Sequence, residues 1–157
     1  MLIEVFSDGS CHNDGSGSTP MGAGGNINFD GETVLEYASP SGFGTSPKAE
    51  WEAFGMMAKI VDTGMGIDFD VKGHDVIFYT DNLMVSRQVK GLDGHSKFIQ
   101  QWRKYIRHYN AVKNRARSCR IVWIPREKNT IADSLATLGR SGVKSLQVNG
   151  EMLTFGE

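Results

Sequence analysis

Short apolar runs alternate with polar, glycine-rich segments along the chain, and their lengths predict a fold of strands and helices. Five runs of four to eight residues have strand character, and Asp30-Gly31 between the second and third predicts a tight hairpin turn. The predicted strands are residues 2–7, 23–29, 33–37, 76–80 and 120–124. The glycine- and serine-rich residues 8–25 and the turn-rich residues 39–47 are interpreted as connecting loops.

Apolar side chains at intervals of three and four residues predict helices between the later strands. The predicted helices are residues 48–61, 82–89, 96–117 and 131–138. The order βββ-α-β-α-α-β-α indicates an α/β protein with a mixed five-stranded sheet flanked by helices. In the tail, Asn149-Gly150 between residues 146–148 and 151–155 predicts a further hairpin.

Composition limits the class of protein. With 157 residues, the chain is expected to form one domain. No apolar run approaches the roughly 20 residues that cross a bilayer, and no secretory signal pattern opens the sequence, so we expect a cytoplasmic protein without membrane contact. Its two cysteines, Cys11 and Cys119, are too few for a disulfide framework or a zinc cluster.

The net charge of −1 conceals an uneven distribution. Residues 1–93 hold 14 acidic and 5 basic side chains, whereas residues 94–126 hold 9 basic side chains and no acidic one. A basic stretch beside an acidic body is typical of a protein that binds a polyanion and also holds cations. A solvated helix face would give the same pattern.

Four acidic residues occupy positions that suggest a shared site. Asp8 and Asp81 directly follow predicted strands, and in open α/β sheets ligands bind beyond the carboxyl ends of strands. Glu50 falls within the apolar stripe of its helix, where an uncompensated charge is costly. Asp133 lies in the first turn of the last helix, and periodicity alone does not place it. Ligands that are all oxygen favour magnesium or manganese over zinc.

Four segments resemble the ribonuclease HI (type 1 ribonuclease H) family. They are Phe-Ser-Asp-Gly-Ser at 6–10, Lys-Ala-Glu-Trp-Glu-Ala at 48–53, Tyr-Thr-Asp-Asn at 79–82, and residues 123–136, which contain Pro-Arg-Glu-Lys-Asn and Ala-Asp-Ser-Leu-Ala. The resemblance implies a βββαβαβα core and a catalytic domain over residues 1–140, with 141–157 as a tail of the same domain. It also implies that Asp8, Glu50, Asp81 and Asp133 are the catalytic metal ligands.

The same resemblance implies the activity and its partners. Two Mg²⁺ ions, replaceable by Mn²⁺, would support hydrolysis of the RNA strand of RNA–DNA hybrids, leaving 5′-phosphate ends. No protein partner is implied, and we expect a monomer. The expected nucleic-acid contacts are Gly9, Ser10, Asn13, Thr45, Asn82, Arg103, Lys104, Arg107, Arg126 and Asn129. The basic residues 97–120 would hold the DNA strand through its phosphates.

One departure from the family pattern concerns proton transfer. Many members carry a catalytic histidine between the last strand and the last helix, but residues 123–133 contain none, and the segment resembles a branch that lacks it. Protonation of the leaving group would then fall to water or to Arg126, Glu127 or Lys128. Two other functions stay open: a related nuclease acting on DNA, and a non-catalytic nucleic-acid-binding module.

Overall fold

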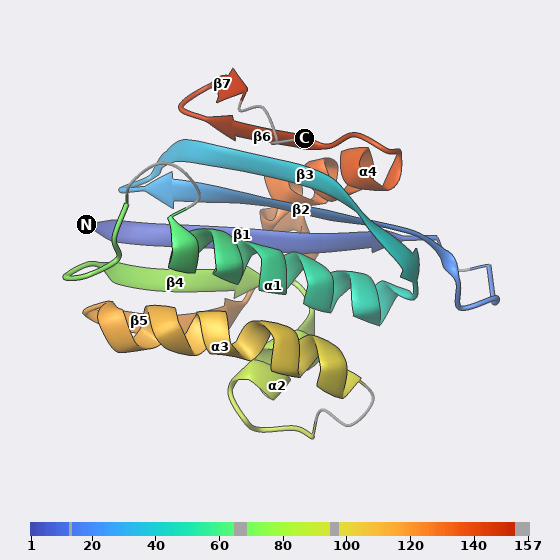
Figure 1. Ribbon diagram of the computed structural model, residues 1–157, viewed down its shortest axis with the longest axis horizontal. Helices are drawn as coiled ribbons and strands as arrows, with labels where there is room; N and C mark the ends of the chain where they lie inside the picture. The colour runs from blue at the N-terminus through green and yellow to red at the C-terminus, as the bar shows by residue number, and fades with distance from the viewer. Residues whose placement is uncertain (13, 65–68, 95–97, 153–157) are drawn as a thin grey trace.

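The computed structural model describes residues 1–12, 14–64, 69–94 and 98–152, which form a seven-stranded mixed sheet with helices on both faces (Figure 1). The spatial order of the strands is β5-β4-β1-β2-β3-β6-β7. Their bounds are β1 Leu2–Cys11, β2 Thr19–Phe29, β3 Glu32–Gly44, β4 Asp75–Thr80, β5 Ser118–Trp123, β6 Ser145–Val148 and β7 Glu151–Met152. The first three strands are antiparallel, while β4 runs parallel to β1 and to β5. The predicted α/β class, and the predicted order of strands and helices along the chain through the last helix, are confirmed.

The helices divide between the two faces of this sheet. They are α1 Ser46–Thr63, α2 Leu83–Val89, α3 Ile99–Arg115 and α4 Thr130–Arg140, with a short 3₁₀ turn at Arg126–Lys128. Helix α1 packs on β1 and β2 from one face, with α3 beside it on the same face, whereas α4 packs on β1, β2 and β3 from the opposite face (Figure 1). Large buried side chains, among them Trp51, Phe54 and Phe78, fill the α1 side. Within the described residues, no helix has the length and hydropathy to span a bilayer.

The strands extend further than the apolar pattern predicts. β1 continues through Asp8 to Cys11, and β2 begins at Thr19, so most of the expected loop at residues 8–25 is a β-hairpin. β3 likewise runs to Gly44. The extensions are rich in glycine and serine, and their strand conformation depends on pairing with each other rather than on apolar alternation. The prediction of loops in these two segments was wrong.

The C-terminal hairpin enlarges the sheet from the expected five strands to seven. Strand β6 pairs with β3, and β7 pairs with β6 across a turn in which Asn149 and Gly150 both have positive φ. Asn-Gly accepts that conformation readily, and a hairpin turn is present where the sequence predicted one. Residues 153–155 of the predicted hairpin lie outside the described residues.

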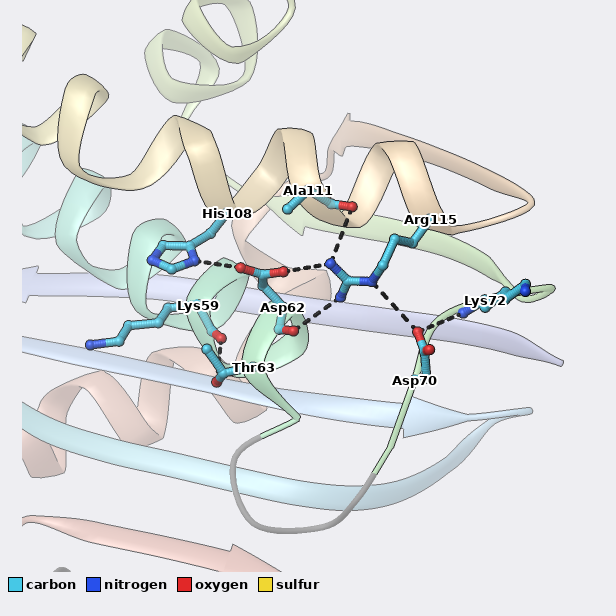
Figure 2. Close-up of polar contacts among 8 residues, drawn as sticks. All are labelled: Lys59, Asp62, Thr63, Asp70, Lys72, His108, Ala111 and Arg115. Atoms are coloured by element: carbon cyan, nitrogen blue, oxygen red, sulfur yellow. Dashed lines mark hydrogen bonds and ion pairs between the residues drawn. The ribbon is translucent and has the colours of Figure 1, made fainter.

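A polar network ties the end of α1 to α3 (Figure 2). The Asp62 carboxylate lies 2.7 Å from His108 Nδ1 and accepts a hydrogen bond of 2.8 Å from Arg115 Nη1, while its backbone oxygen accepts one of 3.0 Å from Arg115 Nη2. Arg115 also lies 3.5 Å from Asp70. Although partial burial opposes ionisation, the hydrogen bonds from His108 and Arg115 hold the pKa of Asp62 below its ordinary value.

We expect Asp62→Asn to lower the free energy of unfolding by about 1–2 kcal/mol at pH 7, because a half-buried, doubly bonded carboxylate is lost. A carboxylate with a depressed native pKa stabilises fully above its unfolded pKa of about 4 and loses this effect as the pH falls. Urea unfolding at several pH values therefore should show the difference between wild type and variant shrinking below about pH 4. Asp93→Asn, which breaks an exposed pair with Arg87, serves as the matched control and should change little.

Candidate active site

Asp8 and Asp81 lie side by side on neighbouring parallel strands. The register pairs Ser7 of β1 with Thr80 at the end of β4, so the following residue of each strand is an aspartate. Asp81 follows its strand as expected. Asp8 is instead inside β1, paired with Gly24 of β2, and only 3% of its surface is exposed. The site is therefore set into the sheet rather than at a free strand end.

Glu50 reaches the pair from the first turns of α1. At Gly9, a Cβ atom would collide with the backbone of Ala49 and Glu50, so glycine is required for α1 to approach β1 this closely. As a result, Asp8, Glu50 and Asp81 each offer a carboxylate oxygen within 4.8 Å of the others. The Gly9 backbone N–H favours the charged form of the Glu50 carboxylate and so lowers its pKa against the effects that raise it.

Asp133 comes from α4 on the opposite face of the sheet. Gly22 and Gly24 of β2 are the partners of Ser10 and Asp8, and a Cβ at either would collide with the α4 backbone around Ala136. This close packing brings Asp133 into the same groove as Asp8, near enough to help raise the pKa of Asp8. All four predicted carboxylates line one groove of about 410 Å³. The groove residues are Asp8, Gly9, Ser10, Cys11, Ser46, Glu50, Asp81, Arg126, Asp133, Thr137 and Arg140.

The carboxylates disfavour each other's ionisation. Burial, and then the charges of Glu50 and Asp81, raise the pKa of Asp8 to about 10. Burial and the charge of Asp81 raise the pKa of Glu50 to about 8, and burial also raises the pKa of Asp81. Converging hard oxygen ligands with this repulsion fit a divalent cation, whose charge would relieve it.

Asn129 is buried and hydrogen-bonds to other residues of the protein. It is 1% exposed, and its side-chain nitrogen donates to the Ser7 carbonyl oxygen at 2.9 Å and to Asp81 Oδ2 at 3.2 Å. It precedes α4, but its side chain makes no capping bond there. The expected nucleic-acid contact is therefore an amide that ties Asp81 to β1.

Arg126 is the charged residue of the 3₁₀ turn that faces the groove. Its Nη2 lies 3.7 Å from Asp133 Oδ1, and 79% of the side chain is exposed. Its charge also lowers the pKa of Glu50 and of Asp81 against the effects that raise them. Glu127 and Lys128 are not among the described residues that line the groove, and Lys128 borders a separate hollow near Phe6.

The other residues expected to contact nucleic acid near the carboxylates differ in whether they line the groove. Ser10 lies in the groove, whereas Asn82 caps α2 by accepting a 2.9 Å bond from the Val85 N–H. Thr45 is exposed, makes no capping bond to α1, and lines a second hollow of about 300 Å³ with His12. Asn13 lies outside the described residues.

The basic residues expected to bind nucleic acid on α3 are exposed, and they are not among the described residues that line the groove. Arg103, Lys104 and Arg107 are on the solvent side of the helix, opposite the buried Tyr105 and Tyr109. Two other bases of the stretch are used within the fold, since Arg115 pairs with Asp62 and Arg117 with Asp75. Part of the basic stretch therefore stabilises the protein itself.

Four groove residues were not anticipated from the sequence: Cys11, Ser46, Thr137 and Arg140. For Thr137 and Arg140 a signal existed, because they follow Asp133 at intervals of four and seven residues and so share its helix face. Cys11 and Ser46 carried no comparable signal. Cys11 lies in the part of β1 beyond Asp8 that was not predicted, and Ser46 precedes the predicted start of its helix at residue 48.

Comparison with known proteins agrees with this geometry. The family model described as reverse transcriptase-like matches residues 7–139. A search of curated protein sequences found no match. Among solved structures, RNase H1 from the archaeon Halobacterium salinarum is 22% identical, with a TM-score of 0.71 over 90% of this chain and 98% of that one.

Two further structures were solved with a bound RNA/DNA hybrid. LC11-RNase H1, isolated from compost by a metagenomic approach, is 25% identical, with a TM-score of 0.71 over 88% of this chain and 96% of its own. The foamy viral protease-reverse transcriptase is 21% identical, with a TM-score of 0.67 over 88% of this chain and 20% of its own. The chain thus belongs to the reverse transcriptase-like family and has the fold of the type 1 ribonucleases H.

Proposed function

We propose that the protein is a metal-dependent endoribonuclease that hydrolyses the RNA strand of RNA–DNA hybrids and leaves 5′-phosphate ends. The observation that carries the proposal is the convergence of Asp8, Glu50, Asp81 and Asp133 in one groove of a ribonuclease H fold. Two similar structures hold an RNA/DNA hybrid, which supports this choice of substrate.

The four carboxylates would hold two Mg²⁺ ions, with Mn²⁺ as a substitute. Such ions activate water and stabilise the charge on the attacking and leaving oxygens of a phosphodiester. Asp8 lies deepest and contacts each of the other acids, so we assign it the central ligand position. Glu50 is oriented by the Gly9 N–H and Asp81 by Asn129, which holds both carboxylates in place before substrate binds.

Arg126 would act through its charge. A guanidinium keeps its proton in proteins, so Arg126 is unsuited to protonate the leaving oxygen. It is suited to stabilise negative charge at the mouth of the groove, beside Asp133. Because Glu127 and Lys128 are not among the described residues that line the groove, we assign the proton on the leaving oxygen to solvent water.

The hybrid would contact the protein beyond the groove. The hollow lined by Thr45 adjoins the groove at Ser46 and lies at the start of α1, where backbone N–H groups favour anions. It would accept a phosphate. Arg103, Lys104 and Arg107 on α3 would hold the opposite, DNA strand, and RNA would be distinguished by its 2′-hydroxyl groups.

Two other functions make different predictions for the same groove. A related nuclease acting on DNA would cleave duplex DNA or junctions in preference to hybrids. A binding module without catalysis would bind nucleic acid yet leave every substrate intact. Parallel assays with a labelled hybrid, duplex DNA, a four-way junction and single-stranded RNA distinguish the three functions.

We expect Asp81→Asn to lower Mg²⁺-dependent cleavage of a labelled RNA–DNA hybrid by about a thousandfold or more, because several kcal/mol of transition-state stabilisation depend on the bound ions. Its circular dichroism should match the wild type. Asp93→Asn, which changes an exposed aspartate outside the groove, is the control and should cleave normally. Full activity of Asp81→Asn would contradict the assignment.

We expect Asp8→Asn to raise the free energy of unfolding of the metal-free protein by roughly 1–3 kcal/mol at pH 7. A carboxyl group with a raised native pKa stabilises most below its unfolded pKa of about 4 and destabilises increasingly as the pH rises towards its native value. Wild type in chelator should therefore lose stability between about pH 4 and pH 8, and the variant should lose less.

The same unfolding experiment tests the cation site. Added Mg²⁺ should stabilise the wild type and have a much smaller effect on Asp8→Asn, because binding to the native state adds to stability. Equal stability of the two proteins in chelator, together with an equal response to Mg²⁺, would argue against a repulsive carboxylate cluster that binds the ion.

A further inference from the structure

The groove continues past the carboxylates to a positive charge at its other end. Asp133, Thr137 and Arg140 follow one another on α4 at intervals of four and three residues, so they form a line along one face of the helix. All three line the groove. At a rise of 1.5 Å per residue, Arg140 lies about 10 Å further along α4 than Asp133.

Strand β1 forms the matching wall. Asp8 and Ser10 are two residues apart, so they lie on the same face of the strand, towards α4. The nearer carboxylates, Asp8 and Asp133, meet at one end, and at the other Arg140 Nη1 donates a 2.8 Å hydrogen bond to Ser10 Oγ. The glycines opposite Asp8 and Ser10 keep α4 close along this whole length, so the position of Arg140 is as constrained as that of Asp133.

Arg140 has unused capacity for an anion. Its side chain is half-buried, and no ion pair among the described residues involves it. A guanidinium offers five N–H donors in a planar fork that matches a phosphate, and the bond to Ser10 uses one of them. A half-buried arginine without a carboxylate, facing a groove, is suited to a ligand that brings the negative charge.

We propose that Arg140 binds a backbone phosphate of the strand being cleaved, a few nucleotides from the phosphate at the carboxylates. The inference rests on the function proposed above. Neighbouring phosphates of one strand are closer together than the roughly 10 Å that separate Asp133 and Arg140 along α4, and both residues line the same groove. Arg140 would thereby set which phosphate of the strand rests at the carboxylates, while Ser10 holds the guanidinium ready.

Hybrid binding tests the proposal on the cleavage-deficient Asp81→Asn protein in Mg²⁺, with fluorescence anisotropy of a labelled hybrid as the readout. Adding Arg140→Gln should weaken binding about tenfold at low salt and reduce the slope of log affinity against log salt by about one. Arg140→Lys keeps the charge and should keep the slope. Lys72→Gln, an equal charge change at an exposed position that precedes β4 and lies outside the groove, should leave binding nearly unchanged.

A purely structural role for Arg140 gives a different result. If Arg140 only braced α4 against Ser10, Arg140→Gln and Arg140→Lys would both lower the unfolding temperature and neither would alter the salt slope. An unchanged slope in Arg140→Gln, while wild type still cleaves the hybrid, would overturn the inference and leave the proposed function standing. Failure of wild type to cleave any hybrid would overturn the proposed function itself.

The identity of the strand is tested with uncharged linkages. Hybrids carry a single deoxynucleotide methylphosphonate, stepped through each position near the cleavage site on one strand or the other. The loss of binding affinity caused by Arg140→Gln should disappear when the neutral linkage is at one position of the RNA-containing strand, because the variant and that linkage remove the same interaction. Loss of the penalty only with linkages in the DNA strand, or at no position, would overturn the assignment.

Discussion

The close approach of two helix backbones to the sheet is the constraint on which the rest of this site depends. Gly9 admits the start of α1, and Gly22 and Gly24 admit α4, at distances where any Cβ would collide with helix backbone. The approach brings Glu50 and Asp133 to Asp8 from opposite sides of one strand. Clustered carboxylates repel each other, so packing elsewhere in the protein must hold them together. Burial, followed by the charges of the neighbouring carboxylates, raises the pKa values of Asp8 and Glu50.

The free energy that offsets this repulsion comes from the apolar core between α1 and the sheet. Helix α1 buries Trp51 and Phe54 against β1 and β4, and α3 is held to α1 through the network around Asp62 (Figure 2). The carboxylate groove and the apolar core thus share α1, which carries Glu50 in its first turns and Asp62 at its other end. Rigid burial of one helix face fixes the direction of its polar residues, which is how a stable core maintains an electrostatically unfavourable site.

The neutral and the positively charged groups around the carboxylates have different effects on the site. Asn129 is buried and orients Asp81 without changing the charge of the site, whereas Arg126 is exposed at its mouth and offsets charge. Arg140 lies at the far end, bound to Ser10, and extends the groove from a cation site into a path for a charged strand. The contribution of each of these polar side chains therefore depends on its burial and its place in the groove, which sequence position alone does not reveal.

Much of the fold followed from the chain itself. Apolar periodicity located the four α-helices of the described residues and the cores of the strands, and Asp-Gly and Asn-Gly identified two of the hairpin turns, because these signals are local. The four acids were recognisable from the segments around them. Tertiary structure decided the rest: Asp8 lies within a strand because β2 pairs with glycine- and serine-rich residues that lack an apolar pattern. It also decided that Asn129 is buried and that the α3 bases do not line the groove, since burial and distance depend on how elements pack, which no local pattern encodes.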